Sequence, residues 1–320
     1  MNPVDRELHL VFGSGPVGMA TAGALLKRNK TVKMVNRSGE IPQFLKDSGV
    51  GGLSCDLMDL TQVLKTAVGA THIYHCANPL YHQWGEILPT IQENLVEASI
   101  KNNAVLVVAD NLYMYARGVE KITDDTLILP PTRKGKIRQN LAKSLEDACK
   151  TRGLKWVAIR ASDYYGPWSG YQSVFGTDRF LDVLNQGKAP AFLGNPDQVH
   201  SYTYIGDFGE ALVLAGLNPQ AHGRAWICPN APVTTTREIG DLFIKNWKGA
   251  VPKLKFGKIP RLALRFLGLF DPVIRELMEM LYQKEEPYVV EGTAFEKAFG
   301  FTPTPLEAGV KSTLAWFKIE

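Results

Sequence analysis

The sequence predicts an α/β fold in which helices cover both faces of a doubly wound parallel sheet. Two observations support this prediction. Short apolar segments alternate with longer helical segments through the first half of the chain, a pattern typical of parallel strands joined by right-handed crossovers. A glycine-rich turn at residues 13–18 also stands between the first expected strand and the first expected helix.

The first strand is expected over residues 7–12, which are short and rich in apolar side chains. The first helix is expected over residues 17–26, which are rich in Ala and Leu and contain no β-branched run. The 320-residue chain is long enough to bury a substantial core around such elements, as one large domain or two smaller ones.

Between these elements, Gly13, Gly15 and Gly18 have the spacing G-x-G-x-x-G. The first glycine permits a tight turn, the second lets a pyrophosphate approach the backbone, and the third lets the helix pack closely on the strand. The helix then begins at Pro16 and Val17 and directs free N–H groups and a positive dipole end at the phosphates. The motif therefore predicts a dinucleotide-binding site.

A second strand is expected over residues 31–35 and is followed by Asn36, Arg37 and Ser38. In dinucleotide-binding folds an acidic residue here bonds the 2′-hydroxyl of the adenosine ribose. This chain lacks that carboxylate, and an arginine can bind a 2′-phosphate through two parallel hydrogen bonds. NADP(H) is therefore predicted over NAD(H). The alternative is that Arg37 is only a solvated loop residue.

A third strand is expected over residues 50–57 and contains Asp56 and Leu57 near its end. Because the carboxyl ends of parallel strands line the ligand crevice, Asp56 is expected near the adenine edge. Asp56 and Leu57 are therefore assigned to the cofactor site.

A fourth strand is expected over residues 71–77 and runs into Asn78. Ala77 is small, so the backbone there can approach the nicotinamide half of the cofactor, and Ala77 and Asn78 are assigned to the cofactor site. His75 lies within this apolar strand and is expected to be a core residue rather than a catalytic one.

The alternation continues through the middle of the chain. Helices are expected over residues 83–102 and 133–152, and strands are expected over residues 104–109, 154–160 and 224–228.

In the second half, Asp207 is expected to cap a helix that runs to residue 217. Capping-box spacing marks two more helix starts, at Thr235–Glu238 and Thr304–Glu307. Residues 261–282 have an amphipathic pattern that favours a lid or a subunit contact over a membrane-surface helix.

The composition excludes several classes of protein. A net charge of +4 is small for this length and gives no indication of a nucleic-acid partner. The four cysteines include no C-x-x-C pair, which favours reduced thiols in the cytoplasm and argues against a structural zinc site. The N-terminus does not resemble a signal peptide, and no apolar run is long enough to span a bilayer. A cytoplasmic protein without metal or membrane partner is expected.

The chain resembles the short-chain dehydrogenase/reductase superfamily, in its extended, epimerase/dehydratase-like branch. The motifs that carry the resemblance are the glycine motif, Asp56-Leu57, His75-Cys76-Ala77, and residues 160–167, 204–207 and 304–309. The resemblance implies a Rossmann-type sheet with a smaller C-terminal substrate-binding region. The NADP-binding domain is then expected at 1–163, completed by about 204–230, and the substrate-binding region at 164–203 and 231–320.

The active-site positions depart from this superfamily. Its members place a Ser or Thr four residues before a Tyr just past the fifth strand, where this chain has Asn111. They also place Tyr-x-x-x-Lys at the start of the next long helix, where this chain has Lys134 and Arg138. Lys136 takes one of these roles if the loop differs by two residues. The resemblance implies an atypical member whose catalytic candidates are Asn111, Tyr113, Lys134 and Arg138.

Hydride transfer to a carbonyl leaves an alkoxide that must receive a proton. Lys134 and Arg138 carry like charges on one helix face, and their repulsion, burial and an oxidised nicotinamide would favour the neutral amine of Lys134. Such a lysine could relay a proton while Arg138 holds the cofactor ribose. Tyr113 is the other candidate, because dehydratase relatives place a catalytic acid two residues before the position of Tyr115. Residues 133–138 equally fit a solvated basic helix start.

One further departure from the family pattern restricts the class of substrate. Nucleotide-sugar enzymes of this branch place a phosphate-binding arginine seven residues before the Asp of Tyr-Ile-Gly-Asp, where this chain has His200. A small carbonyl, alcohol or sugar-derived substrate is therefore expected, with an NADP(H)-dependent oxidoreductase or epimerase as the function. The alternative is a cofactor-binding sensor or regulatory protein. Helices 83–102 and 133–152 resemble those that form homodimers in relatives.

Overall fold

The computed structural model describes residues 7–190, 192–248, 254, 269, 276 and 278–317. The chain divides into two compact units. The first unit contains Met1–Asn111, Lys136–Arg160 and Phe208–Trp226, and the second contains Leu112–Gly135, Ala161–Asp207 and Ile227–Glu320. Residues 112–135 thus group with the second unit, whereas the sequence-based boundaries include them in 1–163.

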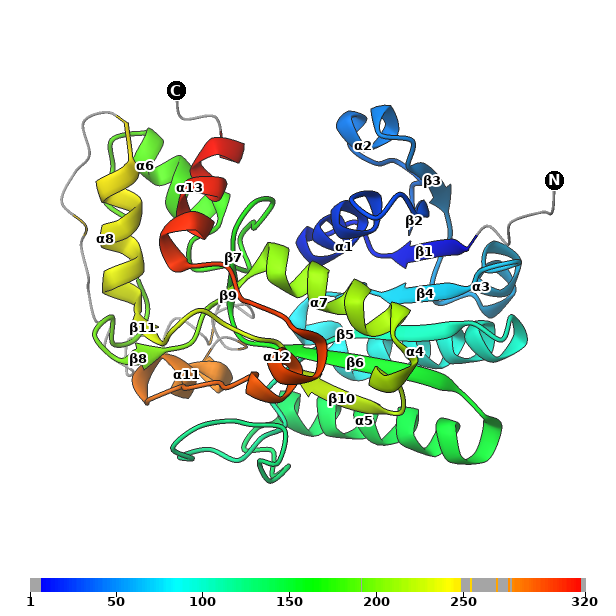
Figure 1. Ribbon diagram of the computed structural model, residues 1–320. Coiled ribbons are helices and arrows are strands. Elements are labelled where there is room, and N and C mark those ends of the chain that lie inside the picture. The colour runs from blue at the N-terminus through cyan, green and yellow to red at the C-terminus, as the bar shows by residue number, and fades with distance from the viewer. Residues whose placement is uncertain are drawn as a thin grey trace. The chain divides into compact units, whose positions relative to one another are not determined.

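The first unit is built on a seven-stranded sheet with the order β10-β6-β5-β4-β1-β2-β3 (Figure 1). The pairs β1–β2, β1–β4, β2–β3 and β4–β5 are parallel, and Phe12 lies in register with both Val35 and His75. The predicted α/β fold with a parallel sheet is therefore confirmed. The strands are β1 (Leu8–Phe12), β2 (Thr31–Asn36), β3 (Gly51–Ser54), β4 (His72–His75), β5 (Val105–Asn111), β6 (Lys155–Ala161) and β10 (Arg224–Ile227).

Helices pack on both faces of this sheet. The elements are α1 (Pro16–Leu26), α2 (Gln43–Asp47), α3 (Leu60–Thr66), η1 (Tyr81–Gln83), α4 (Trp84–Lys101), α5 (Arg133–Arg152), α7 (Ile205–Leu217) and η3 (Pro219–Ala221). The helices α5 and α7 begin in the second unit, because the chain passes from one unit to the other within them.

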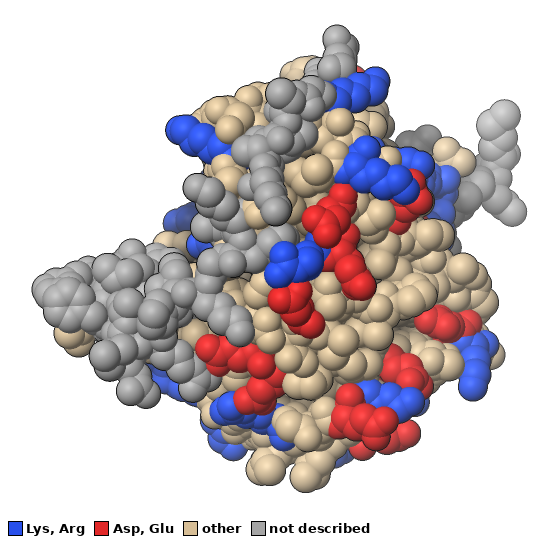
Figure 2. All heavy atoms as spheres, turned by 90° about the vertical axis from the view of Figure 1, so that its left-hand side faces the viewer, with Lys and Arg blue, Asp and Glu red and all other residues tan. Residues whose placement is uncertain are grey.

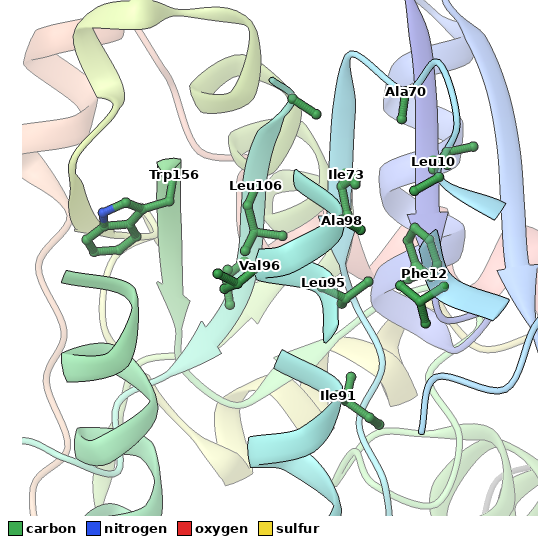
Figure 3. Close-up of a cluster of buried hydrophobic side chains, with 14 of the residues drawn as sticks. Leu10, Phe12, Ala70, Ile73, Ile91, Leu95, Val96, Ala98, Leu106 and Trp156 are labelled. Atoms are coloured by element: carbon green, nitrogen blue, oxygen red, sulfur yellow. The ribbon is translucent and has the colours of Figure 1, made fainter. Parts of the chain in front are cut away.

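Successive side chains of each strand point to opposite faces of the sheet, as the two-residue period of a strand requires. Leu10 and Phe12 join a buried cluster with residues of α3, α4 and α5, among them Leu95 (Figure 3). Val11 lies between them in sequence and points at α1, where an added Cβ on Gly18 would contact it at 3.5 Å. The sheet is therefore buried on both sides, as its continuous apolar strands predict.

The second unit has its own core of aromatic side chains. Phe175 and Phe243 stack with ring centroids 5.5 Å apart, and Phe180 meets the Phe243 ring edge-on at 5.0 Å. Its elements are β7 (Tyr164–Tyr165), η2 (Thr177–Leu181), α6 (Asp182–Asn185), β8 (Val199–His200), β9 (Thr203–Tyr204), β11 (Thr234–Thr235), α8 (Thr236–Asn246), α11 (Tyr282–Glu285), α12 (Thr293–Phe299) and α13 (Leu306–Phe317). β7 pairs with β9 in parallel, and β8 pairs with β11 in antiparallel fashion.

Two of the expected helix caps differ in outcome. The capping box of Thr235 and Glu238 is present at the start of α8. The expectation that Asp207 caps its own helix is wrong, because α7 begins at Ile205. The Asp207 carboxylate instead accepts hydrogen bonds from the Thr304 backbone N–H at 2.7 Å and from the Thr304 hydroxyl at 2.6 Å. The hydroxyl of Thr304 therefore bonds Asp207.

The segment 261–282, for which the sequence favours a lid or a subunit contact, lies largely outside the described residues.

No helix in the described part of the chain is both long enough and apolar enough to cross a membrane.

Candidate functional site

The glycine-rich turn has the geometry that a bound pyrophosphate requires. Gly13 has φ of +113°, and a Cβ there would lie 2.7 Å from the Ala77 backbone nitrogen. A Cβ on Gly18 would lie 1.9 Å from the Gly13 carbonyl oxygen. A Cβ on Gly15, in contrast, would have no atom within 4 Å. Two of the glycines are therefore required by packing, and Gly15 borders open space that a ligand can fill.

The N-terminus of α1 faces this open space with its N–H groups uncapped. Gly15 is the N-cap, Pro16 occupies the first turn, and no side chain caps the helix. The first intrahelical bond runs from the Met19 N–H to the Gly15 carbonyl at 2.9 Å, which leaves the N–H groups of Val17 and Gly18 available to an anion. The turn also follows β1 where the strand order reverses between β4 and β1, the crevice in which such folds bind ligands.

The loop after β2 is organised by Asn36. Its amide nitrogen donates to the Ser14 hydroxyl at 3.0 Å, which joins the loop to the glycine-rich turn. Its amide oxygen accepts from the backbone N–H groups of Ser38 at 3.0 Å and Gly39 at 2.7 Å. Asn36 therefore shapes the loop rather than supplying the carboxylate that a ribose 2′-hydroxyl would need.

The charged groups of this loop leave Arg37 available. Arg37 is exposed, and none of the described residues bonds to its guanidinium. The carboxylate of Glu40 is engaged by the Lys46 ammonium at 3.0 Å. Among the described residues of this loop, a phosphate would thus meet the Arg37 guanidinium, while the Glu40 carboxylate is paired with Lys46.

Asp56 and Leu57 lie beyond the end of β3 rather than within it. The exposed Asp56 carboxylate accepts from the Met58 N–H at 3.0 Å, and the buried Leu57 offers its carbonyl to the Asn94 amide at 2.8 Å. The strand is shorter than expected because its partner β2 ends at Asn36, which pairs with Ser54.

Ala77 and Asn78 follow β4 at the same edge of the sheet as the glycine-rich turn. Ala77 provides the backbone that Gly13 approaches. The exposed Asn78 accepts a hydrogen bond from the Arg138 guanidinium through its amide oxygen at 3.1 Å. These two assigned cofactor residues are thus connected to both the turn and a catalytic candidate.

Arg138 is buried in a charged cluster of the first unit. Its guanidinium lies 3.4 Å from the Asp110 carboxylate and 4.1 Å from the centre of the Trp84 ring. The other Asp110 oxygen accepts from the Arg160 Nε at 3.2 Å. The nearby His75 is fully buried, and burial together with Arg138 lowers its pKa to about 3. His75 is therefore a neutral core residue, as its position in an apolar strand predicts.

Lys134 is completely buried in the second unit and bound by two glutamates. Its ammonium bonds the carboxylates of Glu276 and Glu279, the latter at 2.7 Å, and the Glu276 carbonyl at 3.2 Å. Its backbone N–H donates to Glu279 at 2.9 Å. Burial raises the pKa of Glu276, but Lys134 and Arg133 outweigh burial and lower it overall. The ammonium of Lys134 is thus occupied by structural ion pairs.

Tyr113 belongs to the same unit as Lys134 and is buried, with 9% of its surface exposed. A Cβ on Gly135 would lie 2.2 Å from the Tyr113 carbonyl oxygen, so the start of α5 packs tightly against the chain at Tyr113. Asn111 is the last residue of β5, is half-buried, and belongs to the first unit together with Arg138. The four catalytic candidates therefore fall two in each unit.

Three residues of these sites were not singled out from sequence. Asp110 holds Arg138, and Glu276 and Glu279 hold Lys134. Asp110 carried a signal, since it stands near the end of a parallel strand where ligand-site residues gather. Glu276 carried none, because it follows Lys134 by 142 residues. In the described residues no group of three His, Cys, Asp or Glu side chains could hold a metal ion.

Comparisons with known proteins identify the family and the fold. The model of the NAD dependent epimerase/dehydratase family matches residues 10–228. No curated protein matches the chain. Among solved structures, a UDP-glucose 4-epimerase from Thermotoga maritima, with UDP-glucose, has a TM-score of 0.77 at 16% identity and covers 97% of this chain and 98% of its own.

Two further solved structures show the same fold. A UDP-glucose 4-epimerase from Thermus thermophilus, in complex with NAD, has a TM-score of 0.76 at 20% identity and covers 97% of this chain and 99% of its own. A dTDP-glucose 4,6-dehydratase from Bacillus anthracis, also with NAD, has a TM-score of 0.77 at 13% identity and covers 98% and 96%. With the family model matching more than half of its length, the chain belongs to the NAD-dependent epimerase/dehydratase family.

Proposed function

We propose that the protein is an NADP(H)-dependent oxidoreductase or epimerase acting on a small carbonyl, alcohol or sugar-derived molecule. The observation that carries the proposal is the turn in which Gly15 borders open space between two glycines that packing requires. The uncapped N-terminus of α1 adds N–H donors and a positive dipole end at the same place.

The preference for NADP(H) rests on the loop after β2. Two of the solved relatives are described as NAD complexes. This chain has Asn36 at the end of β2, and the Asn36 side chain is used within the loop. The exposed guanidinium of Arg37 could bind a 2′-phosphate bidentately, which an unphosphorylated ribose cannot offer.

Each remaining site residue has a separate proposed role beside the coenzyme. When bound, the nicotinamide would supply or accept a hydride. Arg138, fixed by Asp110, Asn78 and the Trp84 ring, would hold the ribose. Because two glutamates occupy the Lys134 ammonium, Tyr113 is the proton donor that we propose, with Asn111 orienting the substrate oxygen.

Loss of NADPH fluorescence on incubation with a panel of aldehydes, ketones and sugar derivatives tests the enzymatic proposal. Turnover with at least one carbonyl compound is expected, with a rate that falls in Tyr113→Phe. NADPH binding without turnover on the whole panel would contradict an enzymatic role.

One observation favours a second candidate, a coenzyme-binding sensor or regulatory protein. The Tyr-x-x-x-Lys positions hold Lys134 and Arg138, and both side chains are engaged in buried ion pairs. A sensor would bind NADPH tightly, show no turnover and co-purify with a protein partner.

The partners that we propose are small molecules and a second copy of the chain. We propose no nucleic-acid partner. On the face drawn in Figure 2, the coloured basic side chains stand beside acidic ones and do not merge into one positive field. The four free cysteines support a reducing compartment such as the cytoplasm. The long helices α4 and α5 support a homodimer, which light scattering after size-exclusion chromatography would detect.

A further inference from the structure

One segment of the second unit is held to another by complementary charge. We call Glu276 and residues 278–286 the strap. Its acidic residues bind basic residues of the segment 112–135. The Arg117 Nε donates to both carboxylate oxygens of Glu286, at 2.8 and 2.9 Å, and the Arg133 guanidinium donates to Glu276 at 2.7 Å. With Glu279 on Lys134, three acids of the strap thus each pair with a base of the segment 112–135.

These ion pairs differ in burial, so one end of the strap is fixed and its other end can be released. The Lys134 side chain is 0% exposed and the Glu276 side chain is 9% exposed, so this pair is shielded from salt. The Arg117 and Glu286 side chains are 47% and 33% exposed. Arg117 also lies 5.4 Å from the centre of the Tyr282 ring, within the strap. The Arg117 end therefore depends on contacts that water and ions can reach.

Beyond the strap the chain is anchored by backbone hydrogen bonds and by one ion pair. Tyr288 donates to the Val199 carbonyl at 3.0 Å and accepts from the Ser201 N–H at 2.9 Å. The Glu291 N–H donates to the Ile122 carbonyl at 2.9 Å, and the Glu291 carboxylate binds Lys121 at 2.7 Å. Within the strap, the Lys284 carbonyl accepts from the Asn195 N–H at 2.9 Å. Glu286, in contrast, is held to Arg117 by side chains.

The inner side of the strap completes a polar cluster. Lys284 lies 2.5 Å from the Asp163 carboxylate and 3.3 Å from the Tyr202 hydroxyl, and the Gln283 carbonyl accepts from His200 Nδ1 at 3.0 Å. Burial raises the pKa of Asp163, but Lys284 and His200 outweigh it and lower the pKa overall, so the carboxylate is charged. The Asp163 side chain remains 31% exposed even with the strap in place.

The same two segments line a pocket with tyrosine walls. Tyr115 and Arg117 contribute from the segment 112–135, Tyr282 and Glu286 from the strap, and Tyr288 from the anchored ribbon. The pair of Arg117 and Glu286 therefore joins opposite walls of this pocket. Separating the pair would widen the pocket.

We propose that the Arg117–Glu286 end of the strap is a charge latch over the tyrosine-walled pocket, which opens by releasing Glu286 from Arg117 while Lys284 stays on Asp163. We assign this opening to substrate entry, and only that assignment rests on the proposed function. The latch itself is a property of the second unit and is testable without coenzyme or substrate.

Hydrogen–deuterium exchange of the wild-type chain at two salt concentrations tests the latch. Raising NaCl from 0.1 to 1 M shortens the screening length from about 10 Å to about 3 Å. Amides of residues 278–286 are expected to exchange about two- to five-fold faster at the higher salt, because the exposed pair weakens. Amides of the anchored ribbon at 288–291 are expected to change less. Equal exchange of the strap at both salt concentrations would overturn the proposal.

Charge-reversal variants test whether the Arg117–Glu286 pair controls amide exchange of the strap. Arg117→Glu and Glu286→Arg alone are each expected to raise strap exchange about two- to five-fold, and the double variant is expected to return it to within about two-fold of wild type. Arg237→Glu, which breaks a comparable exposed pair with Asp197 in the same unit, is the control and is expected to leave the strap unchanged. A double variant as fast as the single variants, or an equal effect of Arg237→Glu, would contradict the latch.

Discussion

At the scale of single residues, we propose that Arg37 selects between the two nicotinamide coenzymes. Arg37→Ala is expected to weaken NADPH binding about 10- to 100-fold, because a hydrogen bond to a charged group contributes about 1.5–3 kcal/mol. NADH binding is expected to stay within about two-fold, since it has no 2′-phosphate. Dissociation constants from fluorescence titration measure both. Lys101→Ala is the control, because Lys101 is an exposed cation of the same unit outside the assigned site.

Lys134 is predicted to contribute to stability through its two glutamates. Lys134→Met leaves Glu276 buried without its ammonium partner, and breaking a buried pair costs about 3–5 kcal/mol in the free energy of unfolding. Urea unfolding measures the loss. Lys136→Met, at an exposed position two residues further on, is expected to change stability by less than about 0.5 kcal/mol. Equal stability of the two variants would show that the buried pairs add nothing.

His9 is predicted to make the first unit sensitive to acid. It is buried, stacks on His72 at 4.5 Å, and contacts the Tyr74 hydroxyl at 3.3 Å and the half-buried Glu7, which also binds Lys30. Burial and then His72 lower the pKa of His9 from 6.5 to about 4.

The sign of the pH effect follows from this lowered pKa. Between pH 6.5 and 4 the unfolded chain binds a proton at His9 that the folded chain does not, so stability falls as the pH drops through this window. The loss attributable to His9 is about 3 kcal/mol in total. His9→Phe keeps a stacked ring without a titrating group and is expected to flatten the curve of unfolding free energy against pH. The exposed His82→Phe is the control, and an unchanged curve in His9→Phe would refute the assignment.

At the scale of elements, the β1–turn–α1 unit separates packing from binding at two of its glycines. Gly15→Ala adds a Cβ into open space, so the melting temperature is expected to stay within about 2 °C while NADPH affinity falls at least about ten-fold. Gly18→Ala places a Cβ 1.9 Å from the Gly13 carbonyl oxygen, so the melting temperature is expected to fall even without coenzyme. Differential scanning calorimetry and NADPH titration give the two readouts. Full NADPH affinity in Gly15→Ala would contradict the site.

The elements that sequence predicts best are those whose causes are local. The glycine turn, the strand before it and the capping box at α8 each depend on residues within a few positions, and each forms as expected. The end of β3 depends on where its neighbour β2 stops, so the expected strand is too long. Asp207 binds Thr304 because α13 comes back to it from 97 residues away, which no local pattern encodes.

At the scale of the whole molecule, the fold class could be predicted and the surroundings of the catalytic candidates could not. The alternation of strands and helices determines the parallel sheet, and the family model agrees with it. The partners of Lys134 and Arg138 are contributed by Glu276, Glu279 and Asp110, which only the folded chain brings to them. The sequence therefore predicts which residues stand at the family's catalytic positions, and the structure shows which side chains hold Lys134 and Arg138.

The central claim is that the turn at Gly15 binds the pyrophosphate of a nicotinamide coenzyme and that Arg37 selects the phosphorylated form. Isothermal titration calorimetry of the wild-type protein with NADPH and then with NADH tests it most directly. Saturable heat with NADPH, an affinity at least about ten-fold weaker for NADH, and loss of heat in Gly15→Ala are the predicted results. No heat with either coenzyme at millimolar concentration would contradict the claim.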